Sequence, residues 1–178
     1  PFENTWRELN GVSCIDTAEV RDKKSICTSR SFPGMITDRE ALRTHISNYA
    51  SRCAEKLRRQ HSVCNIMTVF IATNWFRKDL EWYQGMINVT MHTASSNTTE
   101  LVAAASGALD RVYHQGVSYK RAGVIVSGIT PDNAVQLDMF ESDVERRKRL
   151  DSISRTADSI NRRMGTETVV LAAQQYPA

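Results

Sequence analysis

The chain has 178 residues, of which 41% are hydrophobic and 24% are charged, and its formal net charge is +3. This composition excludes a collagen, a disordered acidic tail and a disulfide scaffold, and the length allows one domain with an appendage or two small domains. A charge of +3 does not by itself indicate nucleic acid, because polyanions are bound by clustered charge rather than by the total.

The N-terminal segment shows no clear hydrophobic period, and the chain begins at Pro1 without a methionine or a signal-peptide pattern. We therefore expect residues 1–21 to lead in from an upstream domain of a longer protein. Ser25–Phe32 is rich in β-branched and small residues and precedes Pro33 and Gly34. This pattern predicts a first strand that ends in a turn.

The next segment is predicted to be an amphipathic helix that runs to about Gln60. Thr37 or Asp38 can cap its start. Its apolar residues recur at helical spacing and form one stripe, at Leu42, Ile46, Tyr49, Ala50, Cys53 and Leu57.

Two further strands are predicted after this helix. Residues 65–73 are almost continuously apolar, as in a central strand, whereas residues 87–91 alternate between apolar and polar side chains. No uncharged run is apolar enough to span a membrane.

A second helix and a fourth strand complete the pattern. Thr98 or Thr99 is the expected cap of the helix, which should end near Gln115 and Gly116. Tyr119–Ser127 is the fourth strand. The order β-α-β-β-α-β over residues 22–131 predicts an α+β, ferredoxin-like domain: a four-stranded antiparallel sheet with two helices on one face. The other face should be open and carry polar residues.

The remaining residues form a tether and a tail. Residues 132–141 are the tether, and residues 142–178 are predicted to hold a charged helix followed by a short strand at Thr168–Ala173. The apolar residues of the helix recur at steps of 3 and 4, at Leu150, Ile153, Ala157, Ile160 and Met164. Such a helix packs on the domain or binds a partner, and the pattern does not choose between these.

Cysteine and histidine spacing gives no metal or catalytic motif. Cys14, Cys27, Cys53 and Cys64 include no C-x-x-C pair and are interpreted as free, mostly buried thiols of a reducing cytoplasm. The four histidines, His45, His61, His92 and His114, are scattered one to an element. We predict no catalytic residue, no metal and no cofactor in this chain.

The tether carries the sharpest motif, the string Gln136, Leu137, Asp138, Met139 and Phe140. Three apolar residues outside the domain suggest a peptide offered to a partner, with the Gln136 amide in a polar pocket and the apolar side chains in an adjoining one. Such anchors reach only about micromolar affinity. The alternative is that these residues tie the tail to the domain.

Basic residues gather at the first and fourth predicted strands, which lie near each other in this fold. Lys23, Lys24 and Arg30 flank or enter the first strand, and Lys120 and Arg121 open the fourth. We expect one patch on the open face, where Ser29 and Ser31 could bond phosphate oxygens beside the cations. The alternative is a set of solvated strand ends.

Together these motifs resemble the C-terminal part of Y-family translesion DNA polymerases, in the UmuC (ImpB/MucB/SamB) branch. The resemblance rests on the order and spacing of four segments: Trp6–Gly11, Ser29–Phe32, Tyr119–Val124 and Gln136–Phe140. It covers nearly the whole chain. Met139 stands where Leu is frequent, which should weaken binding little because methionine is apolar and adaptable.

The resemblance implies a little-finger domain that binds the backbone of template-primer DNA through Lys24, Ser29, Arg30, Ser31, Lys120 and Arg121. It also implies that the pentapeptide binds the bacterial sliding clamp. A UmuD-like accessory protein is the candidate partner if the tail binds one rather than packing on the domain. In that family the chemistry belongs to an upstream palm domain that holds Mg²⁺, so this chain should not polymerise DNA alone. The expected setting is DNA damage tolerance in the bacterial cytoplasm, at the nucleoid.

Two other function classes stay open. An RNA-recognition module has the same element order but needs aromatic side chains on its first and third strands, where the sequence offers only Phe32. A small-molecule regulatory domain would not explain the Gln136–Phe140 string. A stand-alone enzyme is the weakest reading, because no nucleophile–base pair appears.

Overall fold

The computed structural model describes residues 2–14, 22–134 and 144–175. The domain consists of β1 (Ile26–Ile36), α2 (Arg39–Arg59), β2 (Ser62–Ala72), β3 (Gln84–Ser95), α3 (Thr98–Val112) and β4 (Tyr119–Pro131). Before it lies α1 (Phe2–Leu9), and after it come η1 (Asp132–Ala134), α4 (Val144–Met164) and η2 (Ala172–Gln174). The predicted β-α-β-β-α-β order is therefore confirmed, and α1 is a helix where none was predicted.

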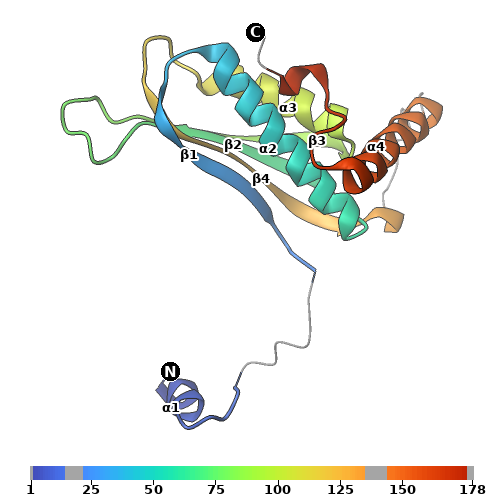
Figure 1. Ribbon diagram of the computed structural model, residues 1–178, viewed down its shortest axis with the longest axis horizontal. Helices are drawn as coiled ribbons and strands as arrows, with labels where there is room; N and C mark the ends of the chain where they lie inside the picture. The colour runs from blue at the N-terminus through green and yellow to red at the C-terminus, as the bar shows by residue number, and fades with distance from the viewer. Residues whose placement is uncertain (1, 15–21, 135–143, 176–178) are drawn as a thin grey trace.

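The four strands form one antiparallel sheet in the order β1-β4-β2-β3. Because β4 is antiparallel to both of its neighbours, β1 and β2 are parallel to each other and α2 connects them across β4. In the same way α3 connects β3 to β4 across β2. Two interlocked split β-α-β units result, and α2 and α3 lie on the same face of the sheet (Figure 1). The predicted α+β class, with two helices on one face, is confirmed.

The core fills the space between this face and the two helices. The stripe predicted for the first helix is buried along α2, and it meets the inward residues of the strands. Fully buried core side chains include Leu42, Ile46, Leu57, Met67, Ile71, Leu101, Leu109, Val124 and Val126. In the part of the chain that the structure describes, α2 and α3 pack on one face only, and the opposite face of the sheet is open (Figure 1).

Helix ends follow local hydrogen bonds. The Asp38 carboxylate caps α2 and accepts from the Ala41 backbone N–H at 2.8 Å, as one of the two predicted caps. At α3 the cap is Asn97 rather than a threonine: its side-chain oxygen accepts from the N–H groups of Thr99 and Glu100. The helix also ends at Val112, earlier than predicted, because Tyr113 already has extended backbone.

The first strand is longer than predicted. It continues past Pro33 and Gly34 to Ile36, with a register shift against β4 between Ser31 and Ile36. Proline is tolerated here because β1 is an edge strand, where a missing N–H removes no ladder bond from a neighbour.

The tail packs on the domain through polar contacts. The Arg58 guanidinium of α2 binds both carboxylate oxygens of Asp158 at 2.6 and 2.7 Å, and it donates to the Ser96 carbonyl. The Asn97 amide lies 3.5 Å from the Ser154 hydroxyl, and Arg147 donates to the Ala94 carbonyl. The packing alternative for the tail helix is therefore the one found.

The inward side of α4 matches part of the predicted apolar stripe. Leu150, Ala157 and Ile160 are half-buried, whereas Ile153 is 54% exposed and Met164 is 74% exposed. Ser154, which is not part of the stripe, is buried beside the Asn97 amide of the domain.

The strand predicted at Thr168–Ala173 is wrong. This segment consists of turns and the short helix η2, which the Asn48 side chain holds by reciprocal hydrogen bonds with Gln174. Across the three described ranges, none of the helices has the length and apolar character needed to cross a membrane.

Candidate nucleic-acid interface

The sheet face away from the helices is the candidate interface. We call it the open face, and define it by three rows of paired residues that run across β1, β4, β2 and β3. The rows are Ser31, Arg121, Ala72 and Gln84; Ser29, Gly123, Phe70 and Met86; and Cys27, Ile125, Thr68 and Asn88. The face mixes hydroxyl, amide and apolar groups, and Arg121 is the charged residue within these rows.

Arg121 is held in place by an aromatic ring. Its guanidinium carbon lies 5.5 Å from the centroid of the Phe70 ring, in a cation–π contact. Phe70 in turn lies over Gly123, because a Cβ added there would be 2.4 Å from Phe70 Cζ. The absence of a side chain at Gly123 therefore lets the ring lie flat on the sheet and carry the cation.

Two hydroxyl groups accompany this cation on the neighbouring edge strand. Ser31 pairs directly with Arg121, and Ser29 pairs with Gly123 one row away. Ser31 is exposed and Ser29 is half-buried. A guanidinium beside serine hydroxyls is a combination that binds phosphate oxygens.

Arg30 and Lys120 do not share the open face. Arg30 alternates with Ser29 and Ser31 and lies on the helix side, where its positive charge, second to burial, lowers the pKa of His45. Lys120 alternates with Arg121, and its ammonium donates to the Pro33 carbonyl at 3.0 Å. Lys120 thus reaches the edge strand β1 and lies next to the open face but not on it.

Lys24 lies at the other end of the sheet. It precedes β1 by two residues, and six residues of extended chain, about 20 Å, separate it from Arg30. The predicted single patch is therefore divided: Ser29, Ser31 and Arg121 lie together, Lys120 borders them, Arg30 faces away, and Lys24 is remote.

Phe70 is a member of the face that sequence reasoning did not single out. It lies in the nearly continuous apolar run of β2, a pattern that indicates a central strand but does not tell one face from the other. The signal that could have found it is Gly123 in the facing strand, since a glycine inside a strand indicates the close approach of another group.

Sulfur and imidazole groups do not form a second site. Cys53 and Cys64 are buried, as predicted, and burial raises the pKa of Cys64 to about 12. Cys14 is half-buried and Cys27 is exposed on the open face. In the part of the chain that the structure describes, no three potential metal ligands come together.

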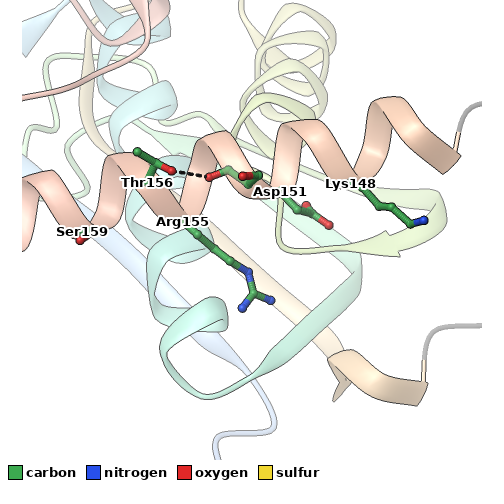
Figure 2. Close-up of a pocket in the computed structure, with 6 residues that line it drawn as sticks. Lys148, Asp151, Arg155, Thr156 and Ser159 are labelled. Atoms are coloured by element: carbon green, nitrogen blue, oxygen red, sulfur yellow. Dashed lines mark hydrogen bonds between the residues drawn. The ribbon is translucent and has the colours of Figure 1, made fainter.

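A hollow of about 540 Å³ runs along α4, and Figure 2 shows that its walls all come from that one helix. It is lined by Lys148, Asp151, Ser152, Arg155, Thr156 and Ser159. The Thr156 hydroxyl donates to the Ser152 carbonyl at 2.9 Å, so it serves the helix itself. Charges of both signs along one helix form a solvated surface and not a converging site.

The predicted clamp motif, Gln136–Phe140, lies outside the described residues. The last described residue before it is Ala134, at the end of η1, and the chain is described again from Val144 at the start of α4.

Comparison with known proteins shows which family the chain belongs to. A sequence model of the impB/mucB/samB family C-terminal domain matches residues 23–139. The chain is 36% identical to Protein SamB of Salmonella typhimurium over 161 residues, which is 90% of this chain and 38% of that protein. It is 31% identical to Protein UmuC of the same species over 174 residues, 97% of this chain and 41% of that protein.

More distant proteins are also similar. DNA polymerase IV of Clostridium acetobutylicum is 22% identical over 166 residues, 93% of this chain and 40% of that protein. A solved complex of the beta-clamp processivity factor and the little finger domain of PolIV matches 65% of this chain and 98% of that chain, at 17% identity and a TM-score of 0.42. The chain spans about two fifths of the length of the curated relatives that it matches. With its model matched from residue 23 to residue 139, the chain belongs to the impB/mucB/samB family and contains the C-terminal domain of that family.

Proposed function

We propose that this chain is the non-catalytic C-terminal region of a translesion DNA polymerase, and that its open face binds the backbone of template-primer DNA. The observation that carries the proposal is Arg121, held over Phe70 beside Ser29 and Ser31 on an uncovered sheet. The relative named DNA polymerase IV supports a polymerase parent.

The chemistry of the face favours DNA backbone over stacked RNA bases. Phe70 is its aromatic ring, but this side chain is only 7% exposed and Arg121 covers it. A stacking platform needs uncovered rings on the sheet face, whereas a cation with hydroxyl neighbours binds phosphates without regard to sequence. Lys120 adds a second positive charge at the rim, and Lys24 and Arg30 contribute only where the duplex reaches beyond the open face.

The test is duplex binding as a function of salt. Replacing two cations, in Lys120→Ala/Arg121→Ala, should weaken binding at least about tenfold at low salt, because each lost contact is a hydrogen bond to a charged group. The slope of log K against log salt should become less steep by about 1.8, since each neutralised phosphate contributes about −0.9. Arg59→Ala, on exposed α2 surface, is the matched control. Equal affinity of the double variant and the control would remove the open face from DNA binding.

We further propose that Gln136–Phe140 binds the sliding clamp. The support is the motif itself and the family in which the chain belongs. Calorimetry with purified bacterial clamp should show about micromolar binding that Leu137→Ala/Phe140→Ala abolishes, because both apolar anchors are lost. Asp138→Ala, which keeps the Gln136 amide and all three apolar side chains, should bind as the wild type does. Unchanged binding by the double variant would leave the segment without this role.

The accessory partner proposed for the tail would meet the outward side of α4. Ile153 and Met164 lie exposed there, while the inward side already contacts the domain. Ile153→Ser should reduce co-purification with a UmuD-like protein and leave duplex binding unchanged. Retention of the partner by this variant would argue against the outward side of α4.

A further inference from the structure

The connection between β2 and β3 exposes three large aromatic side chains that the open face does not use. Trp75 is 70% exposed, Phe76 88% and Trp82 53%. We call residues 73–83 the aromatic loop. In Figure 1 it is the green loop that projects away from the sheet and its helices. Rings concentrated at one exposed place mark an interaction site more often than rings scattered singly over a surface.

The loop is braced from within, so its rings are held outward and do not collapse onto the domain. Backbone N–H groups at its two ends bond across: Thr73 donates to the Tyr83 carbonyl at 2.9 Å, and Tyr83 donates to the Thr73 hydroxyl at 2.8 Å. The rings of Trp75 and Trp82 meet edge to face, with their centroids 5.3 Å apart. An edge-to-face pair leaves ring faces available to a further stacking partner.

The loop begins where the cation of the open face lies. Ala72, the last residue of β2, pairs with both Arg121 and Gln84. Trp75 is three residues further on, so its Cα is at most about 11 Å from that of Ala72. The aromatic loop therefore starts at the Ser31–Arg121 row.

Charge within the loop is balanced. Arg77 forms an ion pair with Asp79, and Lys78 offsets Glu81 in formal charge. The positive charge for a phosphate chain therefore comes from Lys120 and Arg121 on the adjoining strand, while the loop supplies stacking surface. Aromatic rings beside a cationic strand are the combination that binds single-stranded nucleic acid, because every base has a face that can stack.

We propose that the aromatic loop is a base-stacking site for single-stranded DNA at the edge of the duplex-binding face. The inference rests on the proposed DNA function and extends it from duplex to the unpaired strand beyond it. Phe76, the most exposed of the three rings, is the one expected to take a base, with the Trp75–Trp82 pair beside it.

The experiment uses the tryptophans as reporters. All variants are made in a Trp6→Phe background, so that the tryptophan fluorescence comes from Trp75 and Trp82. A 12-nucleotide oligothymidylate should quench this fluorescence, whereas an abasic strand with the same number of phosphates should not. Phe76→Ser should weaken oligothymidylate binding about 5- to 150-fold, the loss that removal of one stacked ring produces. Phe2→Ser, at a ring that is 83% exposed in α1, is the matched control and should bind as its parent does.

Each outcome decides the proposal. Equal quenching by the abasic strand, or equal affinity of Phe76→Ser and Phe2→Ser, would overturn it. Loss of purified clamp binding in Phe76→Ser, with oligothymidylate binding unchanged, would assign the loop to a protein and also overturn it. Failure of the broader function is seen separately, in the binding of blunt duplex, which has no unpaired bases to stack on the aromatic loop.

Discussion

At the scale of single residues, the open face depends on a stack of three groups in which each positions the next. Gly123 leaves room for the Phe70 ring, and the ring lies under the Arg121 guanidinium. A cation held by packing loses less rotamer freedom when it binds a phosphate than one on a free side chain. Phe70 thus acts through Arg121 and is a positioning residue.

Gly123→Ala should disrupt this stack. Its new methyl group would lie 2.4 Å from Phe70 Cζ and 2.5 Å from Ser29 Cβ, so the ring must move. Overpacking of this kind costs about 1–3 kcal/mol, which urea unfolding measures. Duplex affinity should fall as well, since Arg121 loses its support. Gly107→Ala meets nothing within 4 Å on the α3 surface and should instead stabilise the protein by about 0.5–1 kcal/mol. Similar stability of the two variants would contradict the close packing at Gly123.

The orientation of Arg30 gives a second prediction at this scale. Burial, and then the charge of Arg30, hold the pKa of His45 below its ordinary value of 6.5, and the imidazole lies 4.8 Å from the Phe32 ring. An NMR titration of Arg30→Gln should find the His45 pKa raised toward 6.5, whereas Lys24→Gln should leave it in place. An unchanged pKa in Arg30→Gln would put Arg30 on the other side of β1.

The sign of the stability effect follows from the same shift. Below pH 6.5 the unfolded chain takes up a proton that folded His45 resists, so the unfolding free energy falls as the pH drops toward the lower folded pKa. Arg30→Gln should make this fall smaller, because the folded and unfolded pKa values come closer together.

At the scale of elements, a deeply placed ion pair is among the contacts that join the tail to the domain. The Arg58 and Asp158 side chains are 7% and 18% exposed, and they meet with bidentate geometry between α2 and α4. Exposed pairs such as Arg59–Glu55 contribute little, because water already solvates both charges. The position of α4 therefore depends on Arg58 far more than on its neighbour.

Arg58→Ala should cost about 3–5 kcal/mol of unfolding free energy, because it leaves the Asp158 carboxylate without its partner. The tail should also become more sensitive to limited proteolysis. Arg59→Ala, one residue away, should change stability by less than about 1 kcal/mol. Equal proteolysis of the two variants would show that α4 is held by other contacts.

At the scale of the whole molecule, the two faces of the sheet differ. The helices pack on one face, and the other is the open face, which we propose binds DNA. A natural reporter lies in the third row of the open face: Cys27 is exposed there, whereas Cys53 and Cys64 are buried.

Duplex DNA should therefore protect Cys27 from alkylation. Iodoacetamide labelling followed by peptide mass spectrometry should find Cys27 modified in the free protein and slowed in the presence of saturating duplex. Cys14, which precedes the domain, is the internal control and should be labelled equally in both samples. Undiminished labelling of Cys27 under saturating duplex would mean that DNA does not cover this face.

Local pattern was enough to predict the element order, the α2 stripe and the open second face. These features depend on periodicity and capping within short segments, such as Leu42, Ile46 and Leu57 on one side of a helix. The Asn97 cap was missed because three polar residues in succession compete for the same role, and only the hydrogen bonds decide among them.

The sequence by itself determined the family, the domain order and the residues from which the candidate site is drawn. The tertiary structure alone decided which of those residues meet. Strand alternation separates Arg30 from Ser29 and Ser31, and β4 brings Arg121 and Gly123 opposite Phe70 on β2. The placement of Arg30 follows from the period of two along β1, once that strand is known. The meeting of β4 with Phe70 depends instead on the register between strands about fifty residues apart in the chain, and local propensity carries no information about such a register.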